Sequence, residues 1–309
     1  MTNERTYSYL GPAGTFTEAA LAQVPEAKGQ VWKPVANVTQ ALADVTNGIS
    51  DGAILAIENT VEGGVSSVQD ALAKTSGLRI VGEYLVPVSF VLVAPHGTAL
   101  SDVREIAAHP VAYAQCLEWL GANVPGHSQV IAASNVASAI GVLDGSLPAQ
   151  AAIAAPGVVK HFDVEVLADE IGDNPDAVTR FVFVKRVTPP PAPTGYDKTS
   201  LIVELPREVP GALLEMLEQF ATRGINLSLI QSRPIGDRLG RYRFVIDADG
   251  HIDDERMADA LMGLKRFSPN VLFLGSYPRA DRERVHPEPR YSDESFAKAR
   301  DWLAGLRQG

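Results

Sequence analysis

A proline-rich segment divides this chain and limits how it can fold. Residues 188–195 read TPPPAPTG. Proline has a fixed φ and no N–H to donate, so this stretch excludes helix and sheet ladder and favours an extended, semi-rigid spacer. The chain has 309 residues, which at roughly 100–200 residues per domain is room for two domains. We therefore expect a first domain at residues 5–187, a linker at residues 188–197 and a shorter second domain.

The first region alternates between strand-like and helical patterns. Strand patterns occupy residues 7–10, 53–57, 80–93 and 179–185, and helical patterns occupy residues 17–23, 66–74, 112–120 and 135–143. This alternation predicts α/β layering around a mostly parallel sheet. Residues 78–95 are too long for a simple strand-to-helix step, which predicts a crossover into a second lobe and a return of the chain near Val164. We expect two lobes with a cleft between them.

Loops of small or polar residues follow several of these strands and open into helices. They lie at residues 11–15, 58–60 and 133–135. Ligands of open α/β sheets bind beyond the carboxyl ends of strands, and a helix start presents unpaired N–H groups to an anion. The three loops therefore predict an anion-binding crevice.

The second region has a shorter pattern of its own. Strands are expected at residues 200–205, 225–233, 241–247 and 271–277, helices at residues 211–223 and 253–265, and a hairpin turn at residues 236–240. This β-α-β-β-α-β order predicts a ferredoxin-like α+β domain at residues 198–278. The first helix has core spacing at Ala212, Leu213, Met216, Leu217 and Phe220. Residues 279–309 form an extension in which Ser292 is placed to cap a terminal helix.

Charge and composition argue against several classes of partner. The net charge is -10, from 27 basic and 37 acidic side chains, so the sequence offers no basic surface for a nucleic acid. No apolar run approaches the ~20 residues of a membrane-spanning helix, and the first residues do not form a signal peptide. Cys116 is the only cysteine, and none of the six histidines is spaced for a zinc site. We expect a cytoplasmic protein without a metal, a disulfide or a membrane partner.

Four dispersed motifs carry a resemblance to a known family. They are YLGPAGTFT at residues 9–17, IENT at residues 57–60, His109-Pro110 with Gln115, and Thr179-Arg-Phe181. In this order and spacing they resemble bacterial prephenate dehydratase. The second region resembles the ACT domain that follows the catalytic domain in that family. The glycines near Gly11 and Gly14 match neither a P-loop nor a dinucleotide fingerprint.

The resemblance implies a fold, an activity and partners. The catalytic domain would be two-lobed and periplasmic-binding-protein-like, and it would convert prephenate to phenylpyruvate without a cofactor. L-Phenylalanine would be the allosteric effector and would bind between two subunits, so the chain would associate with itself as a dimer or tetramer. Two alternative functions are that of an arogenate dehydratase and that of a non-catalytic two-lobed sensor of a small acid.

The resemblance also assigns roles to single residues. Thr179 would donate a hydrogen bond to the leaving hydroxyl as charge develops there, and Arg180 would bind a carboxylate. The implied catalytic set is Glu58, Asn59, Gln115 and Thr179, and the implied substrate-binding set is Thr15, Thr60, Ser134, Asn135, Arg180 and Phe181. Ala108 departs from the pattern, because relatives carry a serine before His109-Pro110.

Structural roles are open for the same residues. Thr179 suits the start of a buried strand, Arg180 suits a solvated strand edge, and Asn59 suits a turn or cap. Helix capping is the alternative for Thr15, Ser134 and Asn135, and a solvated helix face is the alternative for Gln115. Cys116 and His109 suit structural positions.

The implied effector site lies in the ACT-like region, in two motifs. Its residues are Gly211, Ala212, Leu213, Leu214, Asn226, Ser232, Arg233 and Pro234. The acidic residue usual before Ser-Arg-Pro is replaced by Gln231, which removes a charge and keeps the capacity for hydrogen bonds. The structural alternative is that Gly211 only begins a helix and Pro234 only ends a strand.

Overall fold

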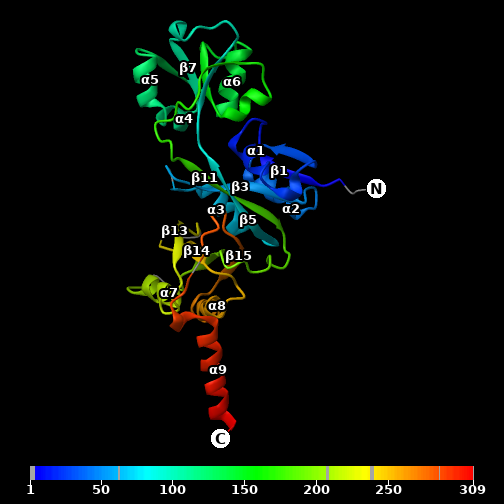
Figure 1. The fold of residues 1–309 in the computed structure, drawn as a ribbon, viewed down its shortest axis with the longest axis vertical. Helices are drawn as coiled ribbons and strands as arrows, with labels where there is room; N and C mark the ends of the chain where they lie inside the picture. The colour runs from blue at the N-terminus through cyan, green and yellow to red at the C-terminus, as the bar shows by residue number, and fades with distance from the viewer. Residues whose placement is uncertain (1–3, 62, 207–208, 237–239, 285, 309) are drawn as a thin grey trace. The chain divides into compact units, whose positions relative to one another are not determined.

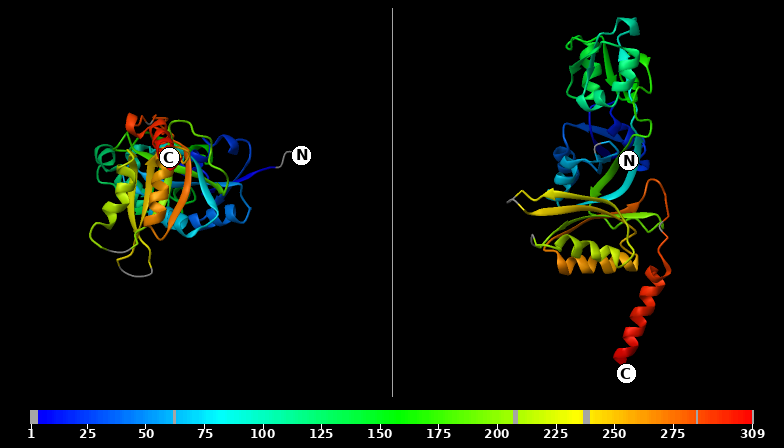
Figure 2. Two further views of the ribbon diagram at one scale, coloured as in Figure 1. Left: turned by 90° about the horizontal axis from the view of Figure 1, so that it is seen from below. Right: turned by 90° about the vertical axis from the view of Figure 1, so that its left-hand side faces the viewer.

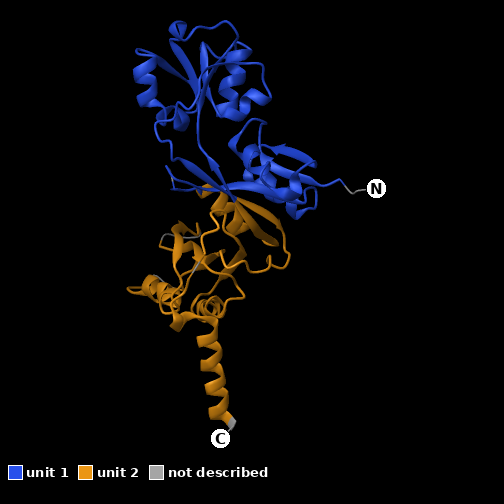
Figure 3. Cartoon of the chain, viewed as in Figure 1, with its two compact units in different colours: residues 1–65, 84–181 blue, residues 66–83, 182–309 orange. Residues whose placement is uncertain are grey.

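The computed structural model describes residues 4–61, 63–206, 209–236, 240–284 and 286–308. Its contacts divide the chain into two compact units (Figure 3). Unit 1 comprises Met1–Val65 and Tyr84–Phe181, and unit 2 comprises Ser66–Glu83 and Val182–Gly309. Each unit is therefore built from two separate stretches of chain.

The first lobe is built on a sheet with strand order β2-β1-β3-β11-β5 (Figure 1). β1 is parallel to β2 and β3, and the short β4 pairs antiparallel with β3. β5 and β11 each contribute residues to both compact units. The strands are β1 (Thr6–Leu10), β2 (Val31–Val35), β3 (Gly52–Asn59), β4 (Gly63–Gly64), β5 (Leu78–Pro87) and β11 (Val178–Arg186), and the helices are α1 (Phe16–Leu21), η1 (Pro25–Ala27), α2 (Val38–Thr46) and α3 (Ser66–Lys74).

The second lobe has its own sheet, with strand order β10-β6-β9-β7-β8. β7 is parallel to β8 and β9, whereas β6 is antiparallel to β9 and β10. Helices α5 and α6 lie on opposite sides of this sheet in Figure 1, and a buried apolar cluster fills each side. The strands are β6 (Val91–Ala94), β7 (Glu105–Ala108), β8 (Ser128–Ile131), β9 (Ala151–Ala154) and β10 (Glu165–Ala168), and the helices are η2 (Leu100–Asp102), α4 (Pro110–Ala114), α5 (Leu117–Asn123), α6 (Asn135–Leu143) and η3 (Pro156–Lys160).

The sequence-based description of these lobes needs corrections. The expected strand at residues 80–93 is two strands, β5 and β6, which lie in different sheets and make the crossover between lobes. The return of the chain near Val164 is wrong, because β10 follows there and pairs with β6 of the second lobe. The chain re-enters the first lobe only at β11.

Two local expectations also fail. The helix at residues 112–120 is wrong as one element, because α4 ends at Ala114 and α5 begins at Leu117. The loop at residues 58–60 does not open directly into a helix. Glu58 and Asn59 are the last residues of β3, and the Gly63–Gly64 pair turns the chain back onto them before α3 begins.

The later part of unit 2 has the predicted β-α-β-β-α-β order. All strand pairs in its sheet, β13-β14-β12-β15, are antiparallel, and α7 and α8 lie side by side on one face of it (Figure 2). Met216 and Phe220 are buried as expected, but Leu213 is 40% exposed, because it lies one position beside the Ala212–Met216–Phe220 stripe. The elements are β12 (Asp197–Glu204), α7 (Ala212–Ala221), β13 (Leu227–Pro234), β14 (Tyr242–Asp249), α8 (Glu255–Phe267) and β15 (Val271–Pro278).

The chain ends in η4 (Pro289–Tyr291) and α9 (Asp293–Gln308), directly after Ser292 as expected. The hairpin turn expected at residues 236–240 falls partly on residues 237–239, which lie outside the described residues. Among the helices of the described residues, none has both the length and the apolar character needed to cross a membrane.

Candidate active site

The end of β3 and the start of β11 bring two sequence motifs together. The Thr60 N–H donates to the Val178 carbonyl, and the Val178 N–H donates to Thr60 Oγ1, each over 3.0 Å. These bonds join the carboxyl end of one strand to the amino end of the other, so the strands run antiparallel. The same register places Asn59 opposite Thr179 and Glu58 opposite Arg180. Because side chains alternate along a strand, each of these pairs shares one face of the sheet.

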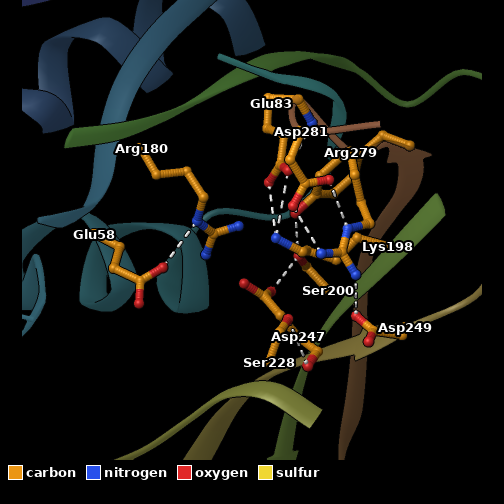
Figure 4. Close-up of polar contacts among 12 residues, drawn as sticks. Glu58, Glu83, Arg180, Lys198, Ser200, Ser228, Asp247, Asp249, Arg279 and Asp281 are labelled. Carbon is orange, nitrogen blue, oxygen red and sulfur yellow. Dashed lines mark hydrogen bonds and ion pairs between the residues drawn. The ribbon is translucent and has the colours of Figure 1, made fainter. Parts of the chain in front are cut away.

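Glu58 and Arg180 form an ion pair on their face. Arg180 Nε donates to Glu58 Oε2 over 3.0 Å (Figure 4). The Arg180 residue is only 6% exposed, whereas Glu58 is half-buried. The alternative of a solvated strand-edge arginine is therefore wrong, since burial of a guanidinium requires a partner of opposite charge or hydrogen-bond acceptors.

Thr179 and Asn59 lie on the other face. Thr179 is 7% exposed, and within the described residues its hydroxyl has no hydrogen-bond partner. Asn59 Oδ1 accepts the Val61 N–H over 2.7 Å, so its carbonyl oxygen holds the turn after β3. Phe181, two residues along from Thr179, is buried and shares its face. This face therefore combines an unengaged hydroxyl with an amide held in place by the backbone.

The loop after β1 connects the two lobes of unit 1. Gly14 has φ +90°, and a side-chain carbon there would lie 3.1 Å from the Val158 Cα of η3. The Gly14 N–H donates to Glu18 Oε2 over 2.6 Å, and the same oxygen lies 2.8 Å from His161 Nε2. Thr15 caps α1: its Oγ1 accepts the Glu18 N–H and donates to the Leu10 carbonyl. The Thr15 hydroxyl is therefore already engaged in two hydrogen bonds within the protein.

The candidate residues of the second lobe begin its helices. Ser134 Oγ accepts the Ala137 N–H over 3.0 Å and caps α6. Asn135 follows it, and its Oδ1 is buried without a hydrogen-bond partner in the described part of the chain. The oxygen and nitrogen of an amide are assigned from their surroundings, so this position can serve as an acceptor or, after a flip, as a donor.

Gln115 lies at the break between α4 and α5. Its carbonyl accepts the Asp173 N–H over 2.7 Å, and the Asp173 carboxylate accepts the N–H groups of Glu118 and Trp119, each over 3.1 Å. The distant Asp173 thus caps α5 and divides the expected helix. The Gln115 side chain donates back to the Val111 carbonyl over 3.1 Å.

The structure brings some of the predicted catalytic and substrate-binding residues together and leaves others apart. Glu58, Asn59, Thr60, Thr179 and Arg180 meet on two neighbouring strands. Within the described residues, no hydrogen bond or ion pair joins Gln115, Ser134 or Asn135 to this group.

The predicted effector residues lie at the start of α7, just before β13 and on β13 itself. Gly211 has φ +87° and begins α7, where Leu213 and Leu214 are exposed and Ala212 is buried. On β13, Ser232 and Pro234 are exposed, whereas Gln231 and Arg233 turn toward α3. Asn226 lies before this strand and donates to Asp249 Oδ2 over 2.8 Å.

One carboxylate of α3 receives two arginines of the second sheet. Arg233 Nη2 lies 2.7 Å from Asp70 Oδ2, and Arg243 Nη2 lies 2.8 Å from Asp70 Oδ1. Hydrogen bonding from Arg233 holds the pKa of Asp70 below its usual value, although partial burial opposes the shift. Beside them, Gln69 Nε2 donates to Gln231 Oε1 over 2.7 Å. Arg233 therefore has an intramolecular partner in place of a free guanidinium.

Known proteins give this arrangement a context. A family model described as prephenate dehydratase matches residues 7–189, and one described as ACT domain matches residues 199–266. The first match spans more than half of the chain.

The chain belongs to the prephenate dehydratase family.

Relatives match over nearly the whole length. Prephenate dehydratase of Amycolatopsis methanolica is 41% identical over 305 residues, which is 98% of either chain. The crystal structure of prephenate dehydratase from Arthrobacter aurescens in complex with L-Phe is 51% identical, with a TM-score of 0.94 over 98% of this chain and 100% of that one. GqqA, described as a novel type of quorum-quenching acylase, is 29% identical, with a TM-score of 0.80 over 90% of this chain. The predicted fold class, a two-lobed α/β domain followed by an ACT domain, is confirmed.

Unit 2 of this prephenate dehydratase family member contains a second cluster of polar side chains. Lys198 Nζ lies 3.1 Å from Glu83 Oε2, and both side chains are buried. Ser200 lies between Asp247 and the Tyr277 hydroxyl, and Arg279 pairs with Asp249 over 3.0 Å (Figure 4). These contacts hold residues of β5 and of the segment after β15 against the ACT sheet.

Cys116 and His109 take structural positions. Cys116 is fully buried in the core of the second lobe, and burial raises the pKa of its thiol to about 12. His109 Nδ1 accepts the Val111 N–H and caps α4. Ala108 is the buried last residue of β7. The described residues contain no group of three His, Cys, Asp or Glu side chains that could hold a metal ion.

Sequence reasoning missed Glu18, His161, Asp173 and Asp70. All four act through partners far away in the chain, up to 173 residues for Asp70 and Arg243. For Glu18, its place in the first turn of α1 beside the glycine loop was the one available signal.

Proposed function

We propose that this protein converts prephenate to phenylpyruvate, with loss of carbon dioxide and water, and that L-phenylalanine inhibits it. The observation that carries the proposal is the antiparallel register of β3 and β11, which places Thr179 opposite Asn59 and beside the Glu58–Arg180 ion pair. It occurs in a chain that belongs to the prephenate dehydratase family over most of its length.

The reaction breaks two bonds of the ring. The bond to the ring carboxylate breaks, carbon dioxide leaves, and its electron pair enters the ring. The bond to the ring hydroxyl breaks at the opposite carbon, and the departing hydroxide takes a proton to become water. Formation of the aromatic ring supplies the driving force, so the protein has to orient a dianion and assist the leaving group.

Thr179 is the proposed donor to that leaving hydroxyl. Its hydroxyl has no partner within the described residues, so donation to substrate breaks no existing hydrogen bond. A positioned donor in a site shielded from water stabilises developing negative charge far more than it would in bulk water. Asn59, held by its bond from Val61, would orient the substrate on the same face.

Arg180 is the proposed carboxylate partner, positioned by Glu58. Charge-assisted hydrogen bonds to a carboxylate are about twice as strong as neutral ones. From the second lobe, Gln115, Ser134 and Asn135 are proposed contacts to the substrate, and the unpartnered Asn135 Oδ1 supports this role. Thr15, Thr60 and Phe181 are proposed to line the site.

L-Phenylalanine is proposed to bind the ACT domain at Gly211–Leu214 and at Asn226, Ser232, Arg233 and Pro234. The exposed Leu213, Leu214 and Ile230 support an apolar contact with a second subunit. β13 is an edge strand of its sheet, and edge strands offer unpaired backbone groups to a partner. We therefore propose a homo-oligomer, a dimer or a tetramer, in the cytoplasm, with domain limits at residues 5–187 and 198–278.

Purified protein incubated with prephenate, and in parallel with arogenate, tests the activity. The expected product is phenylpyruvate from prephenate, at a rate that falls when L-phenylalanine is added. Turnover of arogenate alone would assign the rival substrate. Binding of prephenate without product would make the protein a sensor and would contradict the proposal.

A further inference from the structure

Unit 2 contains a cavity that none of the proposed catalytic, substrate-binding or effector residues lines. It has a volume of about 170 Å³ and is lined by the ends of the ACT strands and by the C-terminal segment. A molecule of liquid water takes roughly 30 Å³, so the cavity has room for a ligand of several non-hydrogen atoms.

The cavity lies at the opposite end of the ACT sheet from the predicted effector residues of β13. Asp197, at the start of β12, and Gly250, directly after β14, line it. Ser232 and Pro234 lie at the other end of the sheet, where they pair with Phe244 and Tyr242 near the start of β14. Asn226, the predicted effector residue at the cavity end of the sheet, donates to Asp249 and does not line the cavity.

Arg256 supplies a buried positive charge to the cavity wall. The residue is 4% exposed, and its Nη1 donates to the Gly224 carbonyl over 3.0 Å. Within the described residues the guanidinium makes no other hydrogen bond and no ion pair. A guanidinium has five N–H donors, and Arg256 lines the cavity, so its remaining donors are open to a ligand there. The side chain can therefore donate to an acceptor within the cavity.

Carboxylates face the same space. Asp254 Oδ2 accepts the His251 N–H, and Asp293 Oδ1 accepts the Glu255 N–H, each over 2.9 Å. In the part of the chain that the structure describes, the second oxygen of each carboxylate has no hydrogen-bond partner. Asp197, by contrast, already accepts three hydrogen bonds from Thr194 and Gly195.

The opposite charges converge over Gly250. A side-chain carbon at Gly250 would lie 2.8 Å from Asp254 Oδ2 and 3.3 Å from Arg256 Nη2. Three carboxylates against one guanidinium would repel a simple anion, whereas a simple cation would leave Arg256 without an acceptor. A ligand with both charges satisfies both sets of groups.

The C-terminal segment completes the wall. Ser292 and Asp293 line the cavity, the Tyr291 ring packs over Gly224, and Arg300 of α9 pairs with Glu255 of α8. This segment is thereby held against the ACT domain at the mouth of the cavity.

We propose that this cavity binds a small zwitterion that carries a carboxylate and an ammonium group, the chemistry of a free amino acid with a small side chain. Arg256 binds the carboxylate, and Asp254 and Asp293 bind the ammonium group. Its lining shares no residue with the proposed active site or with the proposed phenylalanine site.

Saturation-transfer NMR on the full chain with L-alanine, propionate and ethylamine at millimolar concentration tests this site. L-Alanine is expected to bind, and propionate and ethylamine, which each lack one charge, are expected to bind about tenfold more weakly or worse. Equal binding of propionate, or no binding of L-alanine, would overturn the proposal, and in the second case the cavity holds water only.

Variants locate the binding. Arg256→Met and Asp254→Asn are each expected to weaken L-alanine binding about tenfold or more. Arg266→Gln, at an exposed position in the last turn of α8 and outside the cavity, is the control that should bind normally. Asn at position 254 keeps an acceptor for the His251 N–H, so this variant tests the charge even if Arg256→Met fails to fold. Unchanged L-alanine binding in Asp254→Asn would place the ligand elsewhere and contradict the assignment.

Discussion

Two groups of arginine and carboxylate side chains in this protein differ in their number of arginines and in the elements that they join. In unit 1, Glu58 has Arg180 as its ion-pair partner, on strands that also carry Asn59 and Thr179. In unit 2, Asp70 of α3 is shared by Arg233 and Arg243 of the ACT sheet. The first group lies within the proposed catalytic machinery, and the second attaches a helix to the regulatory sheet.

The two carboxylates are close in the sequence. Glu58 is the penultimate residue of β3, and Asp70 lies in the middle of the next helix, twelve positions later. A change that alters how α3 is held on the ACT sheet therefore acts on a segment that continues directly from the catalytic strand. We expect substitutions in the first group to change turnover and those in the second to change the response to phenylalanine.

The largest effect is expected at Thr179. Thr179→Ala removes the proposed donor and should lower kcat about 10²-fold or more, with little change in melting temperature because the side chain is small. Thr179→Ser keeps the hydroxyl and should recover most of the activity. Steady-state kinetics with prephenate measure both variants. Near-normal kcat in a folded Thr179→Ala protein would remove Thr179 from the chemistry.

Arg180 should show a smaller effect, on a different kinetic constant. Arg180→Gln is expected to raise KM about tenfold, because a charge-assisted bond to a substrate carboxylate is lost. Arg186→Gln, at the exposed end of the same strand, is the control and should leave KM unchanged. If Arg180→Gln lowers only thermal stability, the ion pair with Glu58 is structural and the contrast between the two groups fails.

Asp70 should affect regulation and leave catalysis intact. Asp70→Asn weakens the attachment of α3 to both arginines and is expected to change the inhibitory concentration of phenylalanine about fivefold, since coupling free energies of this kind are about 1 kcal/mol or more. The matched control is Asp259→Asn, which breaks an ion pair with Arg223 within the ACT domain. Inhibition curves decide, and equal shifts in both variants would argue against a special role for α3.

The smallest effect concerns acid stability. The pKa of Asp70 is lowered in the folded protein, chiefly by Arg233, so its ionised form favours folding. Its contribution is complete above the ordinary aspartate pKa of about 3.9 and is lost as the pH falls through the lower pKa of the folded state. Unfolding by denaturant between neutral pH and about pH 3 should show less acid destabilisation in Asp70→Asn than in wild type. Parallel curves for the two proteins would contradict this.

The sequence was informative where local patterns decide the structure. The helices at residues 66–74 and 135–143 were predicted with their observed limits, and Ser134 caps the second. The ACT domain followed from its regular alternation of strands and helices. The short Ala151–Ala154 strand was missed, because alanine has low strand propensity and this strand depends on pairing with β6 and β7.

The features that the sequence did not predict depend on tertiary contacts. α4 and α5 are separated because Asp173, more than fifty residues away, caps α5. The motif residues of the active site were predictable from resemblance, but the pairing of Glu58 with Arg180 joins residues 122 positions apart. The partner of Arg233 lies 163 positions away and has no local signal, so Arg233 was assigned to the effector alone.

The buried Glu83–Lys198 pair bears on whether the regulatory part can be exchanged as a module. The proline-rich segment at residues 188–195 looks like the natural boundary at which to exchange one domain for another. A cut there would remove Lys198 and the Ala280 N–H from Glu83, and both arginines from Asp70. A buried carboxylate without its cation is strongly destabilising. A chimera that takes its ACT domain from a relative therefore needs α3 and β5 as far as Glu83 from the same donor. In this protein the boundary of the exchangeable part is set by these ion-pair and hydrogen-bond partners and not by the linker.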